Sequence, residues 1–191
     1  MPSDQTVLAF DTSAAHCAAA LFCNGRVVAT RVDEMGRGQA EHLMPMLETF
    51  LADHDLDWSR LTRIGVGIGP GNFTGIRISV SAARGLALGL GIPAIGVSSL
   101  DAIHRMHPNA FAAVPAPREM IYTQPPGGTP ELRPSADVPE AVFADNPHRL
   151  IAAIAECAAE AQAEQAGRPK PLYVKPADAA PSRDTAPVIL S

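Results

Sequence analysis

Short apolar runs alternate with longer segments of helical periodicity in the first half of the chain. Asn24-Gly25 separates two apolar runs and favours a two-residue hairpin turn, because both residue types tolerate positive φ angles. In a later segment, apolar positions 40, 43, 47, 50 and 51 have the spacing of an amphipathic helix, in which Pro45 predicts a kink or an irregular first turn. The pattern predicts three strands over 6–10, 16–22 and 26–32, a helix over 39–54, a strand over 63–69, a helix over 75–90 capped by Thr74, a strand over 92–97, and a short helix from Ser98 or Ser99 towards His107.

The predicted order, βββαβαβα, indicates an α/β fold. It matches the ribonuclease-H-like motif of the actin-like ATPase superfamily, which includes sugar kinases and Hsp70. Composition changes after this unit, since 12 of the 15 glycines fall within residues 1–100 and 14 of the 18 prolines fall after residue 100. We therefore divide the chain into an N-terminal subdomain, 1–107, and a C-terminal subdomain with a Pro-rich tail, 108–191.

Charge and cysteine content exclude several classes of protein. The net charge of −5 argues against a strongly basic face that grips nucleic acid by itself. Three cysteines are too few for a disulfide framework, and the N-terminal residues do not have the pattern of a secretory signal. The most apolar stretch, 76–97, contains Arg77, Arg84 and Pro93, which argues against a membrane span. We expect a soluble, cytoplasmic protein without membrane contact.

Two polar turns are candidates for phosphate binding through backbone N–H groups, as in nucleotide-binding members of this superfamily. Asp11-Thr12-Ser13 follows the first strand but has no glycine, and Ala15 and His16 would crowd a triphosphate. The second turn, 69–75, leads into a helix but has no Walker A lysine, and a tight strand-to-helix turn anchored by Phe73 is the alternative interpretation. A vestigial nucleotide site would comprise Asp11, Thr12, Ser13, Gly69 and Gly71.

The sequence does not predict a catalytic or metal-binding constellation. His42 has no second ligand within one helical turn, and the helix that carries His104 and His107 ends at Pro108 without a neighbouring acid or cysteine. A triad of Ser13, His42 and Asp11 lacks a nucleophile-elbow sequence. We therefore predict no catalytic residue, no metal and no cofactor.

The two longer predicted helices are the best candidates for a partner interface. Ser81, Gly85 and Gly89 lie four residues apart along a helix that is apolar or small nearly all round, so it needs cover on both faces. The alternative for any one of these small residues is packing against the chain's own sheet. The predicted interface comprises His42, Leu43, Met46, Leu47, Phe50, Arg77, Ser81, Gly85 and Gly89.

Several motifs resemble the TsaB (YeaZ) family. They are Asp11-Thr12-Ser13, the segment EHLMP at 41–45, GPGNFTGIR at 69–77, GLALG at 85–89, IGVSSL at 95–100 and PLYVK at 171–175. The resemblance is dense over 6–105. It implies an actin-like fold with two related subdomains and a role in making threonylcarbamoyladenosine beside the tRNA anticodon.

In that family, catalysis belongs to a paralogue, TsaD. The resemblance therefore implies a non-catalytic scaffold that pairs with a TsaD-type transferase, is joined by a TsaE-type ATPase, self-associates as a homodimer and meets tRNA only indirectly. Family members have a fuller second subdomain, whereas only 84 residues follow position 107 here. We expect a reduced second subdomain, with strands near 110–115 and 119–124, a helix near 147–165 and a loose tail. The alternatives are a metal-dependent glycopeptidase-like hydrolase, an older description of the wider family, and a residual nucleotide-binding module.

Overall fold

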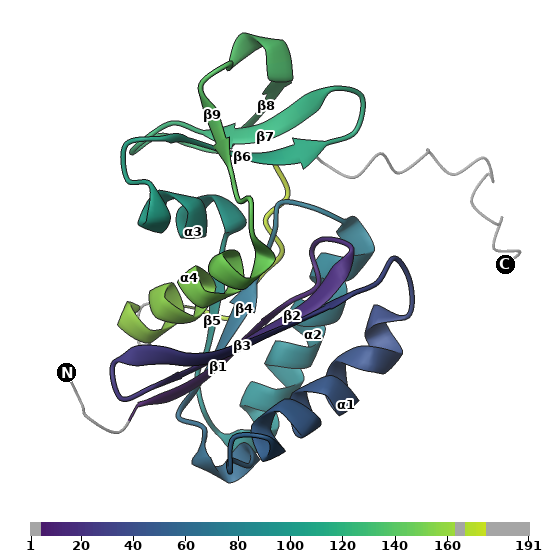
Figure 1. The fold of residues 1–191 in the computed structure, drawn as a ribbon, viewed down its shortest axis with the longest axis vertical. Helices are drawn as coiled ribbons and strands as arrows, with labels where there is room; N and C mark the ends of the chain where they lie inside the picture. Colours follow the sequence, from purple (N-terminus) through teal and green to yellow (C-terminus); the bar gives the residue numbers. More distant parts are fainter. Residues whose placement is uncertain (1–4, 163–166, 175–191) are drawn as a thin grey trace, which may run out of the picture.

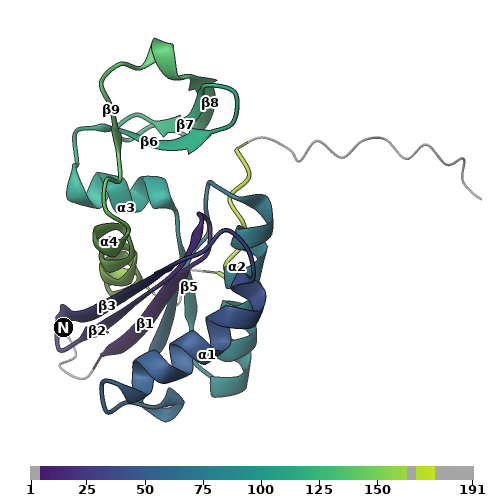
Figure 2. The same cartoon turned by 45° about the vertical axis from the view of Figure 1, so that its right-hand side comes forward.

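Two β-sheets and two layers of helices make up the molecule (Figures 1 and 2). The structure is a computed structural model that describes residues 5–162 and 167–174. From one end to the other, the layers are the second sheet, helices α3 and α4, the first sheet, and helices α1 and α2. This mixed α/β architecture agrees with the predicted fold class.

The first sheet has five strands in the order β3-β2-β1-β4-β5. Its first three strands, β1 (Thr6–Asp11), β2 (His16–Cys23) and β3 (Arg26–Glu34), are antiparallel, whereas β4 (Arg63–Gly67) and β5 (Ala94–Val97) run parallel to β1. Asn24 and Gly25 have φ angles of 52° and 83°, which confirms the predicted hairpin turn.

Helices α1 (Gln39–Ala52) and α2 (Phe73–Leu90) cover one face of this sheet, with a 3₁₀ turn at Trp58–Arg60 between them (Figure 2). Helix α1 continues through Pro45. Asn72, and not Thr74 as predicted, caps α2: its side-chain oxygen accepts a hydrogen bond from Gly75 N at 2.9 Å. Helix α3 (Ser99–Met106) follows β5, and Ser98 caps it by accepting from Asp101 N at 2.9 Å. The predicted order βββαβαβα is therefore confirmed.

The second sheet has four strands in the order β8-β7-β6-β9. The predicted strands near 110–115 and 119–124 correspond to β6 (Phe111–Ala116) and β7 (Met120–Gln124). The sequence analysis did not identify the shorter strands β8 (Glu131–Pro134) and β9 (Ala141–Phe143), which are separated by a 3₁₀ turn at Ser135–Asp137.

Helix α4 (Pro147–Glu160) follows the second sheet in sequence but packs against the first. A Cβ at Gly65 of β4 would lie 2.8 Å from the Ala158 Cβ, so the glycine lets this helix approach the sheet closely. The last residues of the helix predicted near 147–165, from 163 onwards, lie outside the described residues, as does most of the predicted tail. The part of the chain after residue 107 therefore covers the second face of the first sheet.

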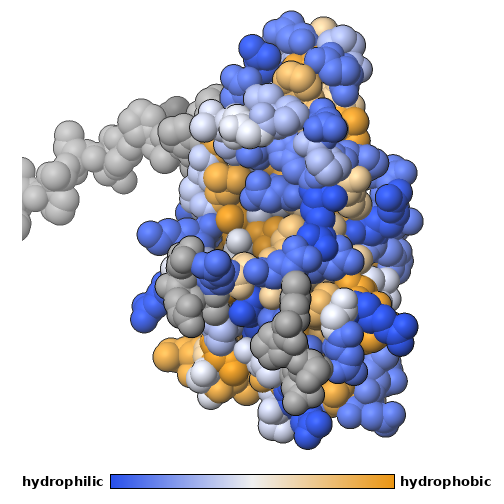
Figure 3. Space-filling model, turned by 90° about the vertical axis from the view of Figure 1, so that its left-hand side faces the viewer, coloured by the Kyte–Doolittle hydropathy of each residue, from blue (hydrophilic) through white to orange (hydrophobic). Residues whose placement is uncertain are grey.

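Two apolar cores lie on opposite faces of the first sheet. One contains α1 and α2, and the other contains α4 and residues of α3. On the face shown in Figure 3, hydrophobic side chains gather in the hollow between the upper and lower parts of the molecule, and the upper part is mostly hydrophilic. Among the described helices, none is long and apolar enough to cross a membrane.

Candidate functional site

The two polar turns singled out as phosphate-binding candidates pack against each other. Thr12 Oγ1 donates a hydrogen bond to Gly75 O at 2.6 Å, and Asn72 N donates to Ser13 O at 2.7 Å. A Cβ at Gly75 would collide with Thr12 O, and one at Gly71 would collide with Ser13 O. Gly71 and Gly75 are thus required for contact between two backbone segments. A cavity of about 670 Å³, lined in part by Ser13, Gly71 and Asn72, lies beside this contact.

Asp11 is the most buried acid of this region, at 2% exposure. Its Oδ2 accepts hydrogen bonds from Ser13 N at 3.1 Å and from Ser13 Oγ at 2.8 Å, and lies 3.3 Å from His16 Nε2. Its Oδ1 has no hydrogen-bond partner within residues 5–162 and 167–174. The Ser13 hydroxyl donates to the carboxylate and not to an imidazole, so the arrangement differs from that of a Ser-His-Asp triad.

His42 lies elsewhere, on α1, and the triad of Ser13, His42 and Asp11 is not assembled. His42 Nε2 lies 2.7 Å from Asp33 Oδ2, and Arg31 donates two hydrogen bonds of 3.0 Å to the same carboxylate. These bonds, first from Arg31 and then from His42, lower the Asp33 pKa below its ordinary value, against the smaller opposing effect of burial. The cluster holds the N-terminal half of α1 against β3.

Other side chains in the described part of the chain do not form a reactive or metal-binding centre. No group of three histidine, cysteine, aspartate or glutamate side chains among them could hold a metal ion. Burial raises the pKa of the Cys17 and Cys157 thiols to about 11, so both are protonated at neutral pH.

Helix α1 does not present its apolar stripe to a partner, which corrects part of the predicted interface. Leu43, Met46, Leu47 and Phe50 are between 0 and 3% exposed and belong to the chain's own core. Helix α1 packs this stripe against the first sheet and α2.

Helix α2 is open along its C-terminal half. Ser81, Gly85 and Gly89 are exposed, and a Cβ at Gly85 or Gly89 would meet no atom within 4 Å. Leu88, on the same half of the helix, is 82% exposed. Arg77, in the N-terminal half, is already engaged: its guanidinium lies 3.8 Å from the centre of the Phe73 ring, and its Nε donates to Tyr173 Oη at 3.0 Å.

An apolar groove of about 520 Å³ runs between the outer sides of α1 and α2. We call it the α1–α2 groove. The predicted interface did not include Met44 or Trp58; the 3₁₀ turn that carries Trp58 has no helical periodicity. The groove is lined by Met44, Trp58, Ala82, Gly85, Leu86, Gly89 and Leu90.

Comparisons with known proteins agree with this architecture. Residues 33–124 match the family model described as TsaD, tRNA N6-adenosine threonylcarbamoyltransferase. The tRNA threonylcarbamoyladenosine biosynthesis protein TsaB of Haemophilus influenzae is 34% identical over 125 residues, which cover 61% of this chain and 52% of that protein. The protein of the same name from Escherichia coli is 37% identical over 94 residues, which cover 49% of this chain and 40% of that protein.

A solved structure shows the same fold. The crystal structure of an uncharacterized Pseudomonas aeruginosa protein, described as similar to peptidase YEAZ, aligns with a TM-score of 0.73 at 24% identity. That alignment covers 90% of this chain and 100% of the solved chain. The present chain spans about half the length, or less, of the two named TsaB relatives. The motifs, the fold and these relatives together support assignment of the chain to the TsaB (YeaZ) family.

Proposed function

We propose that this protein is a non-catalytic subunit in the biosynthesis of tRNA threonylcarbamoyladenosine, and that it pairs with a TsaD-type transferase through the α1–α2 groove. The relatives named for this pathway support the process. The choice of surface rests on one observation: Gly85 and Gly89 face open space along the same helix side as the groove.

Small residues on an exposed helix side allow another helix to approach the backbone closely, and the apolar side chains around them supply contact area. Met44 and Leu86 are partly buried at the groove, so a partner helix would complete their burial. The revised interface keeps Ser81, Gly85 and Gly89. It replaces the four core residues of α1 by Met44, Trp58 and Leu86.

A non-catalytic role is supported by the hydrogen bonds of Thr12 and Ser13, which are made within the chain. Thr12 and Ser13 hold the turn that precedes α2, and Ser13 also donates to Oδ2 of the buried Asp11 carboxylate. The residues of a residual nucleotide site, Asp11, Thr12, Ser13, Gly69 and Gly71, thus serve contacts within the chain. The proposal accordingly assigns transferase chemistry to the partner, with a TsaE-type ATPase and tRNA joining the assembly, and a homodimer through the same groove when the partner is absent.

The test is light scattering on a sizing column with the chain, its TsaD-type transferase from the same genome, and their mixture. We expect a heterodimer peak for the wild-type mixture. Gly85→Leu should abolish this peak because the new side chain fills the groove, and Ala136→Leu, on the exposed 3₁₀ turn of the second sheet, should retain it.

Melting curves of both variants separate pairing from folding. Gly85→Leu should melt close to the wild type, since its Cβ meets nothing within 4 Å. Separate elution of the two wild-type proteins would refute the pairing. Unfolding of Gly85→Leu would show instead that the glycine serves the internal core, and Met44→Ala would then test the α1–α2 groove without adding volume.

A further inference from the structure

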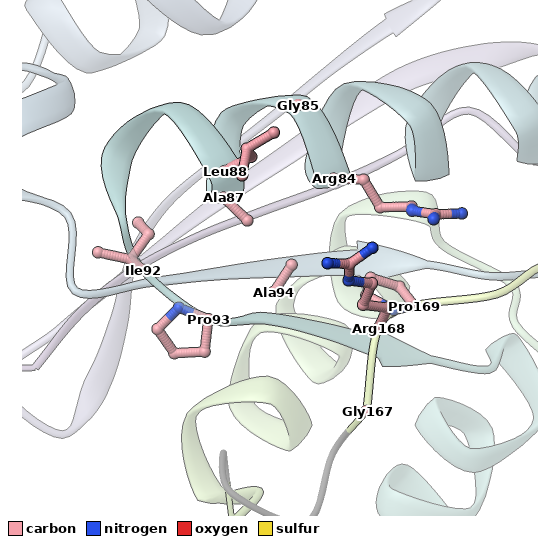
Figure 4. A pocket seen from close by; sticks show the side chains of 10 residues that line it. All are labelled: Arg84, Gly85, Ala87, Leu88, Ile92, Pro93, Ala94, Gly167, Arg168 and Pro169. Carbon is pink, nitrogen blue, oxygen red and sulfur yellow. The ribbon is translucent and has the colours of Figure 1, made fainter.

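A second groove lies on the other side of the C-terminal half of α2, between this helix, β5 and the segment 167–169 (Figure 4). Its volume is about 530 Å³. We call it the arginine groove. Gly85 lines both this groove and the α1–α2 groove, so the two form one surface that wraps around the open half of the helix.

The arginine groove has an apolar end and a cationic end. Figure 4 shows Ile92 and Pro93 at one end and the guanidinium groups of Arg84 and Arg168 at the other. None of the lining residues is acidic. Within residues 5–162 and 167–174, neither arginine makes an ion pair or a side-chain hydrogen bond, which is also true of other exposed arginines such as Arg26 and Arg149, whereas Arg31 and Arg105 are paired with carboxylates.

We propose that the arginine groove binds a segment of the TsaD-type partner that carries an acidic side chain beside aliphatic ones. This inference rests on the proposed function, because the groove continues the surface assigned to pairing. Two guanidinium groups at one site match the geometry of a carboxylate, which accepts paired N–H donors. The exposed Leu88, together with Ile92 and Pro93, offers apolar contact to the flanking aliphatic groups.

A phosphate of tRNA is the other anion that two arginines could bind. The lining favours the protein segment, since it contains aliphatic residues and no aromatic ring on which a base could stack. The net charge of −5 also opposes a nucleic acid, whereas it does not prevent a local pairing with one carboxylate.

The experiment measures the affinity of the chain for the transferase by calorimetry at low and high salt. Arg84→Glu and Arg168→Glu should each weaken binding of the transferase by about tenfold, because the new glutamate would repel the partner's carboxylate, which the wild-type arginine attracts. Arg84→Lys should lose less affinity for the transferase, since lysine keeps the positive charge but lacks the planar guanidinium that donates paired hydrogen bonds. The control is Arg26→Glu, an exposed residue of the β2–β3 hairpin with the same change of charge, and it should bind like the wild type.

The outcomes separate the groove from the pairing itself. Unchanged affinity in both glutamate variants, with the wild type binding normally, would overturn the arginine groove and leave the proposed function intact. A wild-type chain that does not bind the transferase would overturn both. Loss of binding to unmodified tRNA in the two variants, with transferase affinity retained, would assign the groove to RNA phosphate and overturn the protein segment. Equal melting temperatures of all variants would show that the differences arise at the surface.

Discussion

Helices α1 and α2 lie side by side on one face of the first sheet, yet they use their apolar residues differently. Helix α1 buries six of its 14 residues, distributed from Gln39 to Leu51. Helix α2 buries five of its 18 residues, and the last of them is Ala83. From Arg84 to Leu90, α2 has no fully buried residue although it remains apolar. One helix is therefore completed by its own chain, and the second half of the other stays open.

This difference shows which sequence feature distinguishes a helix buried within the chain from a helix that stays open along one half. Both helices have an apolar stripe, so the stripe alone does not decide. In α1 the stripe consists of large residues that fill the volume above the sheet. In the open half of α2, glycine alternates with alanine and leucine, and the glycine positions have no neighbour within 4 Å.

The largest effect expected from this comparison concerns a pair of leucines. Leu47→Ala removes a side chain that is 0% exposed from the core of α1 and should lower the free energy of unfolding by about 2–5 kcal/mol. Leu88→Ala, on the open half of α2, should change it by less than about 0.5 kcal/mol. Urea titrations of the two variants measure both quantities. Equal losses of stability would mean that the open half of α2 is covered within the chain.

The same two leucines should have different effects on assembly. Leu88→Ala should weaken binding to the TsaD-type transferase by about tenfold, because an exposed aliphatic anchor is lost while the fold is kept. Leu47→Ala should leave the affinity of the folded fraction unchanged. Calorimetric titration below the unfolding transition measures both affinities, and a Leu88→Ala variant that binds at wild-type strength would exclude this residue from the interface.

A pair of glycines in α2 compares the two halves of one helix. Gly75→Ala should destabilise the protein by about 1–3 kcal/mol, because its Cβ collides with the backbone oxygen of Thr12. Gly85→Ala should stabilise the free chain by about 0.5–1 kcal/mol, since alanine is the better helix former and the space is empty. Thermal unfolding measures the two shifts, which should have opposite signs. A loss of stability in Gly85→Ala would contradict an open surface at that position.

Local signals in the sequence predicted most of the first sheet and its helices. Asn24-Gly25 strongly favours a two-residue hairpin turn. The order of the predicted strands and helices matched the ribonuclease-H-like motif. The cap of the second long helix was predicted two residues too late. Thr74 and Asn72 both have suitable side-chain oxygens, but Asn72 N also donates a hydrogen bond to Ser13 O, and this contact favours Asn72 as the cap. The capping residue therefore depends on a tertiary contact, which the local sequence pattern does not predict.

The site was harder to predict because burial depends on what lies opposite. The periodicity of α1 identified Leu43, Met46, Leu47 and Phe50 but not the direction in which they point. The sequence analysis rejected a triad of Ser13, His42 and Asp11 and did not predict that His16, five residues after Asp11, lies beside this carboxylate. The arginine groove joins Arg84 to Arg168, which are 84 residues apart in sequence, and no motif connects them.

The smallest effect concerns Asp33, whose hydrogen bonds with Arg31 and His42 join β3 to α1. The Asp33 pKa is lowered from its ordinary value of 3.8 by Arg31 and His42. A carboxylate with a lowered pKa in the folded state contributes stability above its unfolded pKa, and this contribution is lost as the pH falls through 3.8 towards the folded value. Asp33→Asn should therefore reduce stability at pH 6 by less than about 1 kcal/mol, since the pair is partly exposed.

The stability difference between the wild type and Asp33→Asn should depend on pH in a definite direction. The difference in unfolding free energy between the wild type and Asp33→Asn should be constant near neutral pH and should shrink as the wild-type carboxylate becomes protonated below about pH 4. Asp57→Asn is the matched control: hydrogen bonds from Ser59 lower the pKa of that carboxylate too, but it caps the 3₁₀ turn and does not contact α1. If Asp33→Asn also weakened binding to the transferase, the hydrogen bonds of Asp33 would contribute to the shape of the α1–α2 groove. Unchanged binding would show that the groove keeps its shape without the hydrogen bond between Asp33 and His42.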